Sequence, residues 1–434
     1  MRPTHAAPRS SRRAVLGAAA SSAVLAACAG GGEGAAPPAP DRSGAGRVEL
    51  WQLYANSPAA AQLKELFQRK HPRIRVEWVD VPGGEQPQKL TVASAAGTPP
   101  DATAANAPFF GDLSRFYRPL DDYLKRDARQ VDVDDWLPVW RKASAIKGQT
   151  LGLPLEVAVR GWWFNKHLLE EQGVPSPARA GAPAQVDYRE LETLASRLTY
   201  ARGDAQVYGL YVARGWWEVL VYVYGFGGAF LDADHTRCLL DTPQAIAGLE
   251  YANDLVVKRQ VAPADGAIET FEQQGTIAMA LHNAARAQNL RRLPQGTQWD
   301  TGPVVKGPGA PLSFAFIHQL GVVKAARNPD GAWAIGAEYT GKDANPIWME
   351  HHGWPTARKS YLDAYTRDGT PPPDSRQNLL EWIKAAPVVT FPTGYTANVA
   401  PIANAIVTEL TRGQRTARDA ATALGREITA VLER

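Results

Sequence analysis

The sequence predicts an α/β protein with a mainly parallel sheet and two lobes. Strand-like and helix-like segments alternate from residue 48 onward, and repeated strand–helix units at this spacing imply parallel strands joined by right-handed crossovers. The chain has 434 residues, which is more than one ordinary core accommodates, so we expect two lobes or domains. The sequence has no internal period typical of repeat proteins, which argues against a solenoid or a propeller.

Residues 1–27 predict an export signal rather than part of the folded protein. Four arginines and no acidic residue precede an apolar run of 14 residues at 14–27. A membrane-spanning helix needs about 20 apolar residues, so this run is too short to be a permanent anchor. The string SRRAVLG resembles a twin-arginine export signal, and LAAC resembles the lipobox of bacterial lipoproteins. We therefore expect the mature chain to begin at a lipidated Cys28 and to work outside the cytoplasm, anchored to the cell membrane.

Residues 28–46 predict this lipidated cysteine and a flexible tether. After Cys28 the sequence AGGGEGAAPPAPDRSGAG is mostly Gly, Ala and Pro and has no apolar anchor. The second cysteine, Cys238, then has no intramolecular partner, so no disulfide framework is expected. Its position in the strand-like string RCLLD predicts a small buried apolar residue.

The first folded segments are a strand, a helix, a second strand and a second helix. A buried strand is predicted at 48–54, and Ser57 with Pro58 predicts the start of a helix. Alternation of apolar and charged residues predicts a strand at 74–81. A helix is predicted at 88–97, ending at a glycine, and a third unit begins at residue 101.

Later helices carry clear start signals. Asp187 followed by Glu190 predicts a capping box, and Pro243 and Pro329 are each predicted at the first position of a helix. Two helices are predicted at the C-terminus on either side of Gly413, and the second begins with a capping pattern at Thr416.

Charge and motifs exclude several classes of function. The chain has a formal net charge of +3, but the export segment holds four arginines, so the remaining 407 residues carry 43 basic and 44 acidic residues. This balance gives no electrostatic footprint for nucleic acid. The sequence contains no zinc spacing, no P-loop and no nucleophile elbow. We therefore expect no catalytic residue, no metal and no cofactor.

Several segments in order resemble the extracellular solute-binding proteins of ABC importers, in particular the family that binds sugars. LWQLYANSPAAAQLKELFQRKHPRIRVEWVDVPG resembles that family's first strand, ligand loop, helix and second strand, and QKLTVASAAGTPPD resembles a frequent passage that follows. GLPLEVAVRGWWFNKHLLEEQGV resembles the crossing into the second lobe. HQLGVVKAARNPDGAWAIGAEYTG resembles the return strand and helix, and TRGQRTARDAATALGREITAVL the closing helices.

The resemblance implies the two-lobed periplasmic-binding-protein-like fold of type II, with a ligand cleft between lobes joined by hinge segments. It places lobe 1 at 47–154 plus 299–341 and lobe 2 at 155–298 plus 342–434. Lobe closure would capture a ligand and create the surface that a permease recognises. It also implies a monomer that works with permease subunits and a separate ATPase, since this chain has no P-loop.

A sugar site needs aromatic faces, and four aromatic residues of lobe 2 are candidates. Trp216 and Trp217 follow a strand-like segment where the resembling family carries a stacking residue, and we expect the two neighbours to face different ways. Trp354 and Tyr395 lie in loop-like sequence. Ordinary core filling is an alternative for each. Four other tryptophans fall inside periodic strands or helices and are assigned to the core: Trp51, Trp78, Trp333 and Trp382.

Five polar residues are candidates for binding hydroxyl groups. Asn56 follows the first strand, Asn106 follows the third, and Glu156 and Arg160 lie near the crossing between lobes. Asn283 lies in ALHNAARA, which departs from the turn typical of the resembling family. Glu156 and Arg160 could instead form a hinge ion pair, and the asparagines could cap loops.

Other functions remain open. The same receptor could bind a polyol, a glycerophosphodiester or an amine; an arginine cluster in the cleft would favour an anion and an aromatic cage a cation. A secreted carbohydrate-active hydrolase is a further alternative, although no pair of catalytic carboxylates is evident in the sequence.

Overall fold

The computed structural model describes residues 44–433, apart from residues 53, 147, 180, 182–184, 214, 353–354 and 368–370. The predicted export signal, Cys28, most of the tether and Trp354 lie outside the described residues. Within the described part of the chain, the helices are too short or too polar to cross a bilayer.

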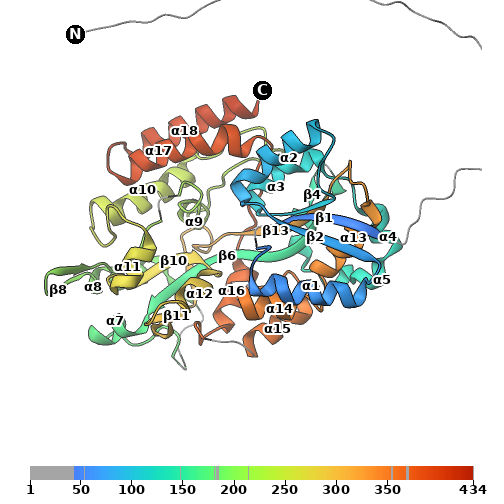
Figure 1. Cartoon of the computed structure of the whole chain (residues 1–434). Coiled ribbons are helices and arrows are strands. Elements are labelled where there is room, and N and C mark those ends of the chain that lie inside the picture. Colours follow the sequence, from blue (N-terminus) through green and yellow to red (C-terminus); the bar gives the residue numbers. More distant parts are fainter. Residues whose placement is uncertain are drawn as a thin grey trace, which may run out of the picture. The chain divides into compact units, whose positions relative to one another are not determined.

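One large sheet runs through the molecule (Figure 1). Its strands are β1 (Gly46–Gln52), β2 (Ile74–Asp80), β3 (Ala102–Ala105), β6 (Leu153–Asn165), β10 (Met279–Asn283), β11 (Trp299–Thr301) and β13 (Ala315–Val322). The order is β10-β6-β13-β3-β1-β2, and β11 also pairs with β6. In this sheet, as far as the structure describes it, β1 pairs in parallel with β2 and β3, whereas β13, β10 and β11 pair antiparallel with their neighbours. The sheet is therefore mixed, and the predicted parallel arrangement holds for its first three strands.

Short two-stranded sheets and helices complete the fold. The small sheets pair β4 (Ala145–Ile146) with β5 (Gln149–Thr150), β7 (Gln185–Asp187) with β12 (Val304–Lys306), and β8 (Tyr200–Arg202) with β9 (Ala205–Val207). The helices are α1 (Pro58–Lys70), α2 (Gln86–Ala95), α3 (Ala107–Leu113), α4 (Asp121–Arg126), α5 (Ala128–Val131), α6 (Pro138–Ala143), α7 (Lys166–Glu171), α8 (Tyr188–Arg197), α9 (Leu220–Gly225), α10 (Pro243–Val257), α11 (Ile268–Gln274), α12 (Arg286–Leu290), α13 (Pro329–Tyr339), α14 (Asn345–His352), α15 (Lys359–Arg367), α16 (Gln377–Ala385), α17 (Ala400–Thr411) and α18 (Ala417–Leu432). The 3-10 turns are η1 (Gly83–Glu85), η2 (Ser114–Phe116), η3 (Val133–Asp135) and η4 (Gly296–Gln298), and η5 (Tyr395–Val399) is a π-helix.

The predicted helix starts are confirmed by their caps. The Ser57 hydroxyl accepts a hydrogen bond from the Ala60 amide at 3.2 Å. Asp187 and Glu190 form the predicted capping box at α8. Thr416 accepts from the Asp419 amide at 3.1 Å at the start of α18. These local signals fix helix ends because they satisfy amides that lack partners within the helix.

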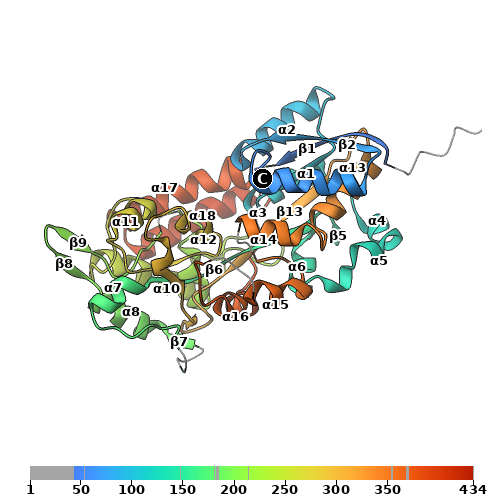
Figure 2. The same cartoon turned by 60° about the horizontal axis from the view of Figure 1, so that its bottom comes forward.

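The hydrophobic interior is divided into two main cores. The first core packs around β1, β3, α1, α13 and α14 and includes Leu50, Leu63, Leu153 and Leu155. The second core is larger, begins on β6 at Val157 and includes α9, α10 and α16 to α18. In Figure 2, α1 and α13 lie beside β1 and β2, and α7, α8 and α11 lie at the other end of the molecule. Cys238 is fully buried in the second core, as predicted.

This packing places the two ends of β6 in different hydrophobic cores. Leu153 and Leu155 pack in the first core and Val157 in the second, one residue from the sequence-based boundary at 154/155. Residues 299–317 share the second core because β11 and the start of β13 pair with β6. Residues 344–348 share the first core, because α14 packs on α1. We therefore propose that the boundaries predicted at 299 and 342 move to about 318–320 and to the segment after α14.

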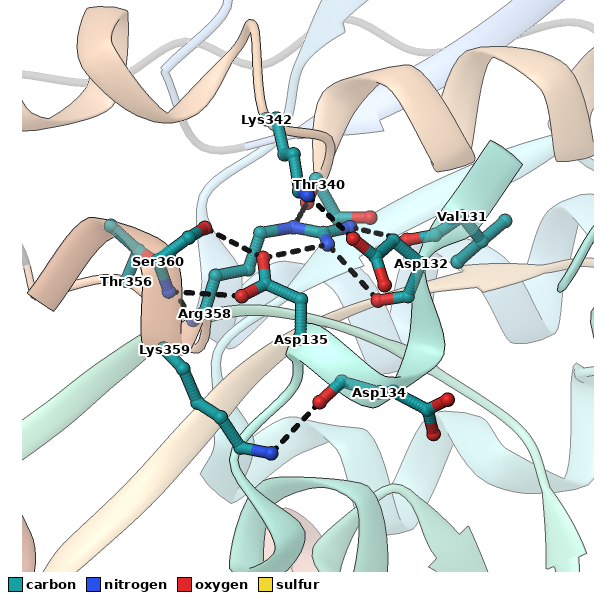
Figure 3. Close-up of polar contacts among 10 residues, drawn as sticks. All are labelled: Val131, Asp132, Asp134, Asp135, Thr340, Lys342, Thr356, Arg358, Lys359 and Ser360. Carbon is teal, nitrogen blue, oxygen red and sulfur yellow. Dashed lines mark hydrogen bonds and ion pairs between the residues drawn. The ribbon is translucent and has the colours of Figure 1, made fainter. Parts of the chain in front are cut away.

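A buried arginine fixes the segment that follows α14 (Figure 3). Arg358 is 2% exposed, and its guanidinium donates to the backbone oxygens of Thr340 at 2.9 Å and Val131 at 3.0 Å. Asp135 lies 3.4 Å from the same guanidinium and accepts from the Ser360 amide and hydroxyl at 2.9 and 2.8 Å. The chain is therefore fastened to the first lobe where it leaves α14 and turns toward the second core.

A second junction joins α3 of the first lobe to η5 of the second. The Thr396 amide donates to the Asp112 carboxylate at 2.9 Å. Gly111 lies so close to the opposite chain that a Cβ atom there would stand 2.5 Å from the Phe391 carbonyl oxygen and 2.8 Å from that of Pro392. We call this contact, formed by Gly111 and Asp112 with residues 391–396, the α3–η5 seam.

Candidate functional site

The central strands β6 and β13 present one continuous face of polar and aromatic side chains. His318 lies opposite Glu156 and Phe316 opposite Ala158, and the Arg160 amide donates to the Phe314 oxygen at 2.9 Å. Because side chains alternate along a strand, these six lie on the same side of the sheet. We call it the β6–β13 face: Glu156, Ala158, Arg160, Phe314, Phe316 and His318. Ala158, Phe314 and Phe316 belong to the second core, and Glu156 follows Leu155 of the first core.

Arg160 is completely buried on this face and is neutralised there. Its Nε and Nη2 donate to the two oxygens of Glu218 at 3.2 and 2.9 Å. Three rings surround its guanidinium, with centroid distances of 4.9 Å to Trp217, 4.7 Å to Phe314 and 4.6 Å to Phe316. Planar guanidinium groups stack well on aromatic rings. The structure thus places Arg160 in a buried ion pair with Glu218, which lies in the same predicted lobe, rather than in the hinge ion pair that the sequence left open.

Burial and pairing act in opposite directions on Glu218. Burial alone would raise the pKa of its carboxyl group, but the positive charge and hydrogen bonds of Arg160 outweigh burial and lower the pKa below the usual glutamate value. Glu218 therefore carries a negative charge at neutral pH, and the pair with Arg160 has no net charge.

The two adjacent tryptophans face different ways. Trp216 is fully buried, donates through Nε1 to the Tyr395 hydroxyl at 3.1 Å and packs on Phe230 at 4.7 Å between centroids. Trp217 is half-buried, and its ring lies 5.7 Å from that of Phe316. The geometry makes Trp216 and Tyr395 core residues and leaves Trp217 as the aromatic side chain at the face.

A small pocket opens at the first-lobe end of the β6–β13 face. It is partly open to solvent and is lined by Gln52, Tyr54, Ala104, Ala105, Asn106, Leu155, His318 and Tyr339. These residues come from β1, β3, β6, β13 and α13 and the segments that follow β1 and β3. The carboxyl ends of neighbouring parallel strands gather side chains at one edge of a sheet, which is where α/β proteins commonly bind ligands.

Polar groups around this pocket are incompletely satisfied. Gln52 Oε1 accepts from the Tyr54 amide at 3.1 Å and the Tyr339 hydroxyl at 2.9 Å, while its buried Nε2 has no hydrogen-bond partner. Glu156 is 3% exposed and pairs through Oε1 with His318 Nδ1, while Oε2 has no hydrogen-bond partner. Burial raises the pKa of Glu156 to about 7, although the neighbouring His318 acts to lower it. Such groups can exchange hydrogen bonds with a ligand.

The other predicted residues lie apart from these contacts. Asn56 is exposed and donates to Asp80 at 3.0 Å. Asn283 lies opposite Arg160 on β10 and therefore on the same side of the sheet, but its Oδ1 accepts from the Ala285 amide at 2.9 Å, which is a loop cap. Of the nine predicted ligand residues, the structure brings Asn106, Glu156, Arg160 and Trp217 to the β6–β13 face or its pocket.

A larger hollow on the first lobe is a less suitable ligand site. It is lined by Lys70, His71, Gln130, Val131, Ala337, Glu338, Gly341, Lys342, Asp343 and Arg358. Its cationic side chains already pair with carboxylates: Lys70 with Glu338 and Asp343, Lys342 with Asp132, and Arg358 with Asp135.

Comparison with known proteins gives a consistent result. The family model for bacterial extracellular solute-binding proteins matches residues 52–346. The fold is similar to an ABC substrate-binding protein of Listeria monocytogenes in complex with cycloalternan, with a TM-score of 0.78, 20% identity and coverage of 89% of this chain and 98% of that one. It is also similar to the GacH receptor of Streptomyces glaucescens, solved unliganded and with acarbose (TM-score 0.75, 20% identity, 90% and 99% covered). A third similar structure is a cyclic α-maltosyl-1,6-maltose binding protein of Arthrobacter globiformis (TM-score 0.73, 19% identity, 90% and 99% covered).

Proposed function

Because the chain belongs to the bacterial extracellular solute-binding protein family, we propose that it captures a mono- or oligosaccharide between its lobes and delivers it to the permease of an ABC importer. Its fold is the two-lobed α/β fold of type II periplasmic binding proteins, as the sequence predicted. The proteins it resembles are solute-binding proteins rather than enzymes.

The observation that carries the sugar proposal is the Trp217 ring, held half-buried beside a charge-neutral ion pair. Trp217 stacks on the guanidinium of Arg160, which Glu218 neutralises. The apolar C–H face of a sugar ring packs well on such an aromatic surface, and uncharged polar groups suit its hydroxyls. Asn106 and Gln52 supply amide groups in the adjoining pocket.

The charge balance favours a neutral ligand over the other solutes. Binding a glycerophosphodiester would require arginines whose positive charge is not already compensated. The charge of Arg160 is neutralised by Glu218. An amine would call for an aromatic cage, and the rings of Phe314 and Phe316 already enclose Arg160. A polyol remains compatible with this lining and is distinguished from a sugar by the binding assay.

Isothermal titration calorimetry tests the proposal. The panel is glucose, tagatose, maltose, maltotriose, acarbose and cycloalternan, with glycerol and glycerophosphocholine as non-sugar solutes. At least one saccharide is expected to bind with a micromolar or lower Kd. Binding of a non-sugar solute at that affinity, together with no binding of any saccharide, would contradict the sugar assignment.

Replacing Trp217 by Ala should weaken saccharide binding because it removes the stacking surface. Truncating an aromatic anchor at a binding site typically costs about 2 kcal/mol, which corresponds to a roughly 30-fold rise in Kd. The matched control is Trp78→Ala. Trp78 is also half-buried, but it stacks on Phe67 at 5.5 Å on the edge strand β2, so its loss should lower stability and leave Kd unchanged. Equal effects of the two substitutions on Kd would remove Trp217 from the site.

The proposal includes a lipid anchor at Cys28, export by the twin-arginine route and a monomeric working state. The motifs SRRAVLG and LAAC support the first two. The family works outside the cytoplasm, which is compatible with both.

A further inference from the structure

Glu156 and His318 form a polar pair at the boundary between the lobes. They lie directly opposite each other on β6 and β13, and the carboxylate contacts His318 Nδ1. The side chains are 5% and 12% exposed. His318 lines the pocket at the end of β1 and β3, and Glu156 contacts His318 beside that pocket. A change in the protonation of this pair therefore changes the charge next to the proposed ligand site.

The other groups that face Glu156 do not supply a fixed positive charge. Tyr54, which follows β1, and Tyr339 from α13 lie close enough to Glu156 to interact with its charge. Burial, and in addition the negative charge of Glu156, raises the pKa of both tyrosines. Thr356, which bridges to Glu156 from the segment after α14, is not titratable. Among the described residues, the salt bridges of Glu156 involve His318 but neither lysine nor arginine. Arg160, further along the same face, is neutralised by Glu218.

The pair lacks one hydrogen bond that a carboxylate would normally receive. Oε1 contacts His318, but Oε2 has no donor. A buried carboxylate with an unsatisfied oxygen is costly in its ionised form, so burial favours the protonated form. A ligand hydroxyl is a donor of the kind that Oε2 lacks. Donation of its hydrogen bond would favour the ionised form and displace the proton.

We propose that ligand capture releases one proton from the Glu156–His318 pair, because a ligand hydroxyl donates a hydrogen bond to Glu156 Oε2. This inference rests on the receptor function proposed above and adds regulation of the same site by pH. The proton leaves to solvent, and no covalent bond of the ligand changes.

The direction of the pH dependence follows from linkage. Burial raises the pKa of Glu156 to about 7 without ligand, and the ligand hydroxyl lowers it. Below about pH 7 binding must displace the proton, so affinity is reduced; above it the carboxylate is already ionised. The Kd is therefore expected to fall about tenfold between pH 6 and pH 8 and to level off at higher pH.

Calorimetry measures the released proton directly. The tightest-binding sugar of the panel is titrated in phosphate and in imidazole, which both buffer from about pH 6 to pH 8 and differ in ionisation enthalpy, at about pH 6, 7 and 8. The dependence of the binding enthalpy on the buffer should give about one proton released at pH 6 and almost none at pH 8. Uptake of a proton, or no exchange at pH 6, overturns the inference.

Two variants separate this pair from other buried acids. Glu156→Gln keeps the size of the side chain but cannot titrate, so proton release and the pH dependence of Kd should both disappear. Asp300→Asn is the matched control. Asp300 is 4% exposed and burial raises its pKa, but it binds Ser375 at 2.8 Å outside the β6–β13 face. This variant should release the same proton as the wild type. Loss of release in both variants, or in neither, overturns the inference.

Failure of this inference differs from failure of the proposed function. Sugar binding without proton release leaves the receptor function intact and removes only the linkage. If no saccharide binds, the receptor proposal fails first, and an infrared titration of the ligand-free protein tests the pair alone. The difference between wild type and Glu156→Gln should show a carboxyl group titrating near pH 7, and a midpoint below about 5 overturns the inference.

Discussion

Arg160 and Glu218 show how strongly one buried charge depends on another. Arg160 is wholly enclosed by protein, and Glu218, 58 residues further along the chain, provides its counter-charge. When one partner of a buried ion pair is removed, the other charge still pays the full cost of desolvation. Removing one partner therefore destabilises the protein more than replacing both by apolar residues.

Replacing Glu218 by Gln should therefore destabilise the protein. The variant leaves the Arg160 charge buried without compensation and should lower the free energy of unfolding by about 3–5 kcal/mol. Urea denaturation at pH 7 measures it. The matched control is Glu381→Gln, since Glu381 also pairs with a cation, Lys384, but both side chains are 40% or more exposed. That substitution should cost less than about 1 kcal/mol.

The same pair predicts a specific acid sensitivity. Because pairing with Arg160 lowers the pKa of Glu218 in the folded protein, its stabilisation is fully present above the usual glutamate pKa of about 4.3. It is lost as the pH falls through the lower folded value. The stability difference between wild type and Glu218→Gln should therefore shrink under acid conditions. A difference that stays constant down to about pH 3 would contradict this assignment of charge.

At the residue scale the sequence predicted part of the site. Asn106, Glu156 and Arg160 were chosen because they follow a strand or lie at the lobe crossing, and they do lie at the β6–β13 face or its pocket. Glu218 and His318 were missed, because their importance comes from strand pairing and chain folding across many residues. Gln52 could have been found, since it follows two buried apolar residues at the carboxyl end of β1, where α/β proteins commonly bind ligands.

At the element scale, local signals were reliable and long-range ones were not. Caps at Ser57, Asp187 and Thr416 were predicted because a cap depends on residues within one turn. The antiparallel pairing of β13 with β3 and β6 was not predicted, because it joins segments more than 150 residues apart. The α3–η5 seam likewise depends on a contact of α3 with residues 391–396.

Replacing Gly111 by Ala should disturb this seam. The added Cβ would stand 2.5 Å from the Phe391 oxygen, and backbone on both sides must shift to receive it. Overpacking of this kind typically costs about 1–3 kcal/mol, which exceeds the roughly 1 kcal/mol that alanine gains over glycine inside a helix. Thermal and urea unfolding measure the loss. The control is Gly84→Ala, whose Cβ would meet its nearest neighbour at 4.0 Å and should be tolerated. If Gly111→Ala is as stable as the wild type, the α3–η5 seam can accommodate the added Cβ atom and the prediction is wrong.

At the scale of the whole molecule, the two cores account for the two-lobed fold. The sequence predicted two lobes from chain length and family resemblance, and the fold bears this out. The proposed lobe boundaries differ from the predicted ones where β11 and α14 pack, because the core that an element joins is set by its partners and not by its own sequence.

Cys28→Ser tests the proposed anchor in the intact protein. Without a thiol the residue cannot be lipidated, so the protein should move from the membrane fraction to the soluble fraction when cells are fractionated. Its Kd for the identified saccharide should stay unchanged, because the folded lobes begin beyond the tether. Retention of the variant in the membrane fraction would contradict lipid anchoring at this residue.

The closed pairing of Arg160 with Glu218 has a further consequence for a protein that works outside the cytoplasm. Dissolved ions weaken the attraction between a charged site and a charged ligand. They have little effect on a site whose buried charges neutralise each other and are covered by aromatic rings, as those of Arg160 and Glu218 are. Capture of a neutral sugar would thus proceed much the same in dilute and in saline surroundings. Under the proposed proton release, acidity acting through Glu156 is then the property of the medium to which the receptor would respond.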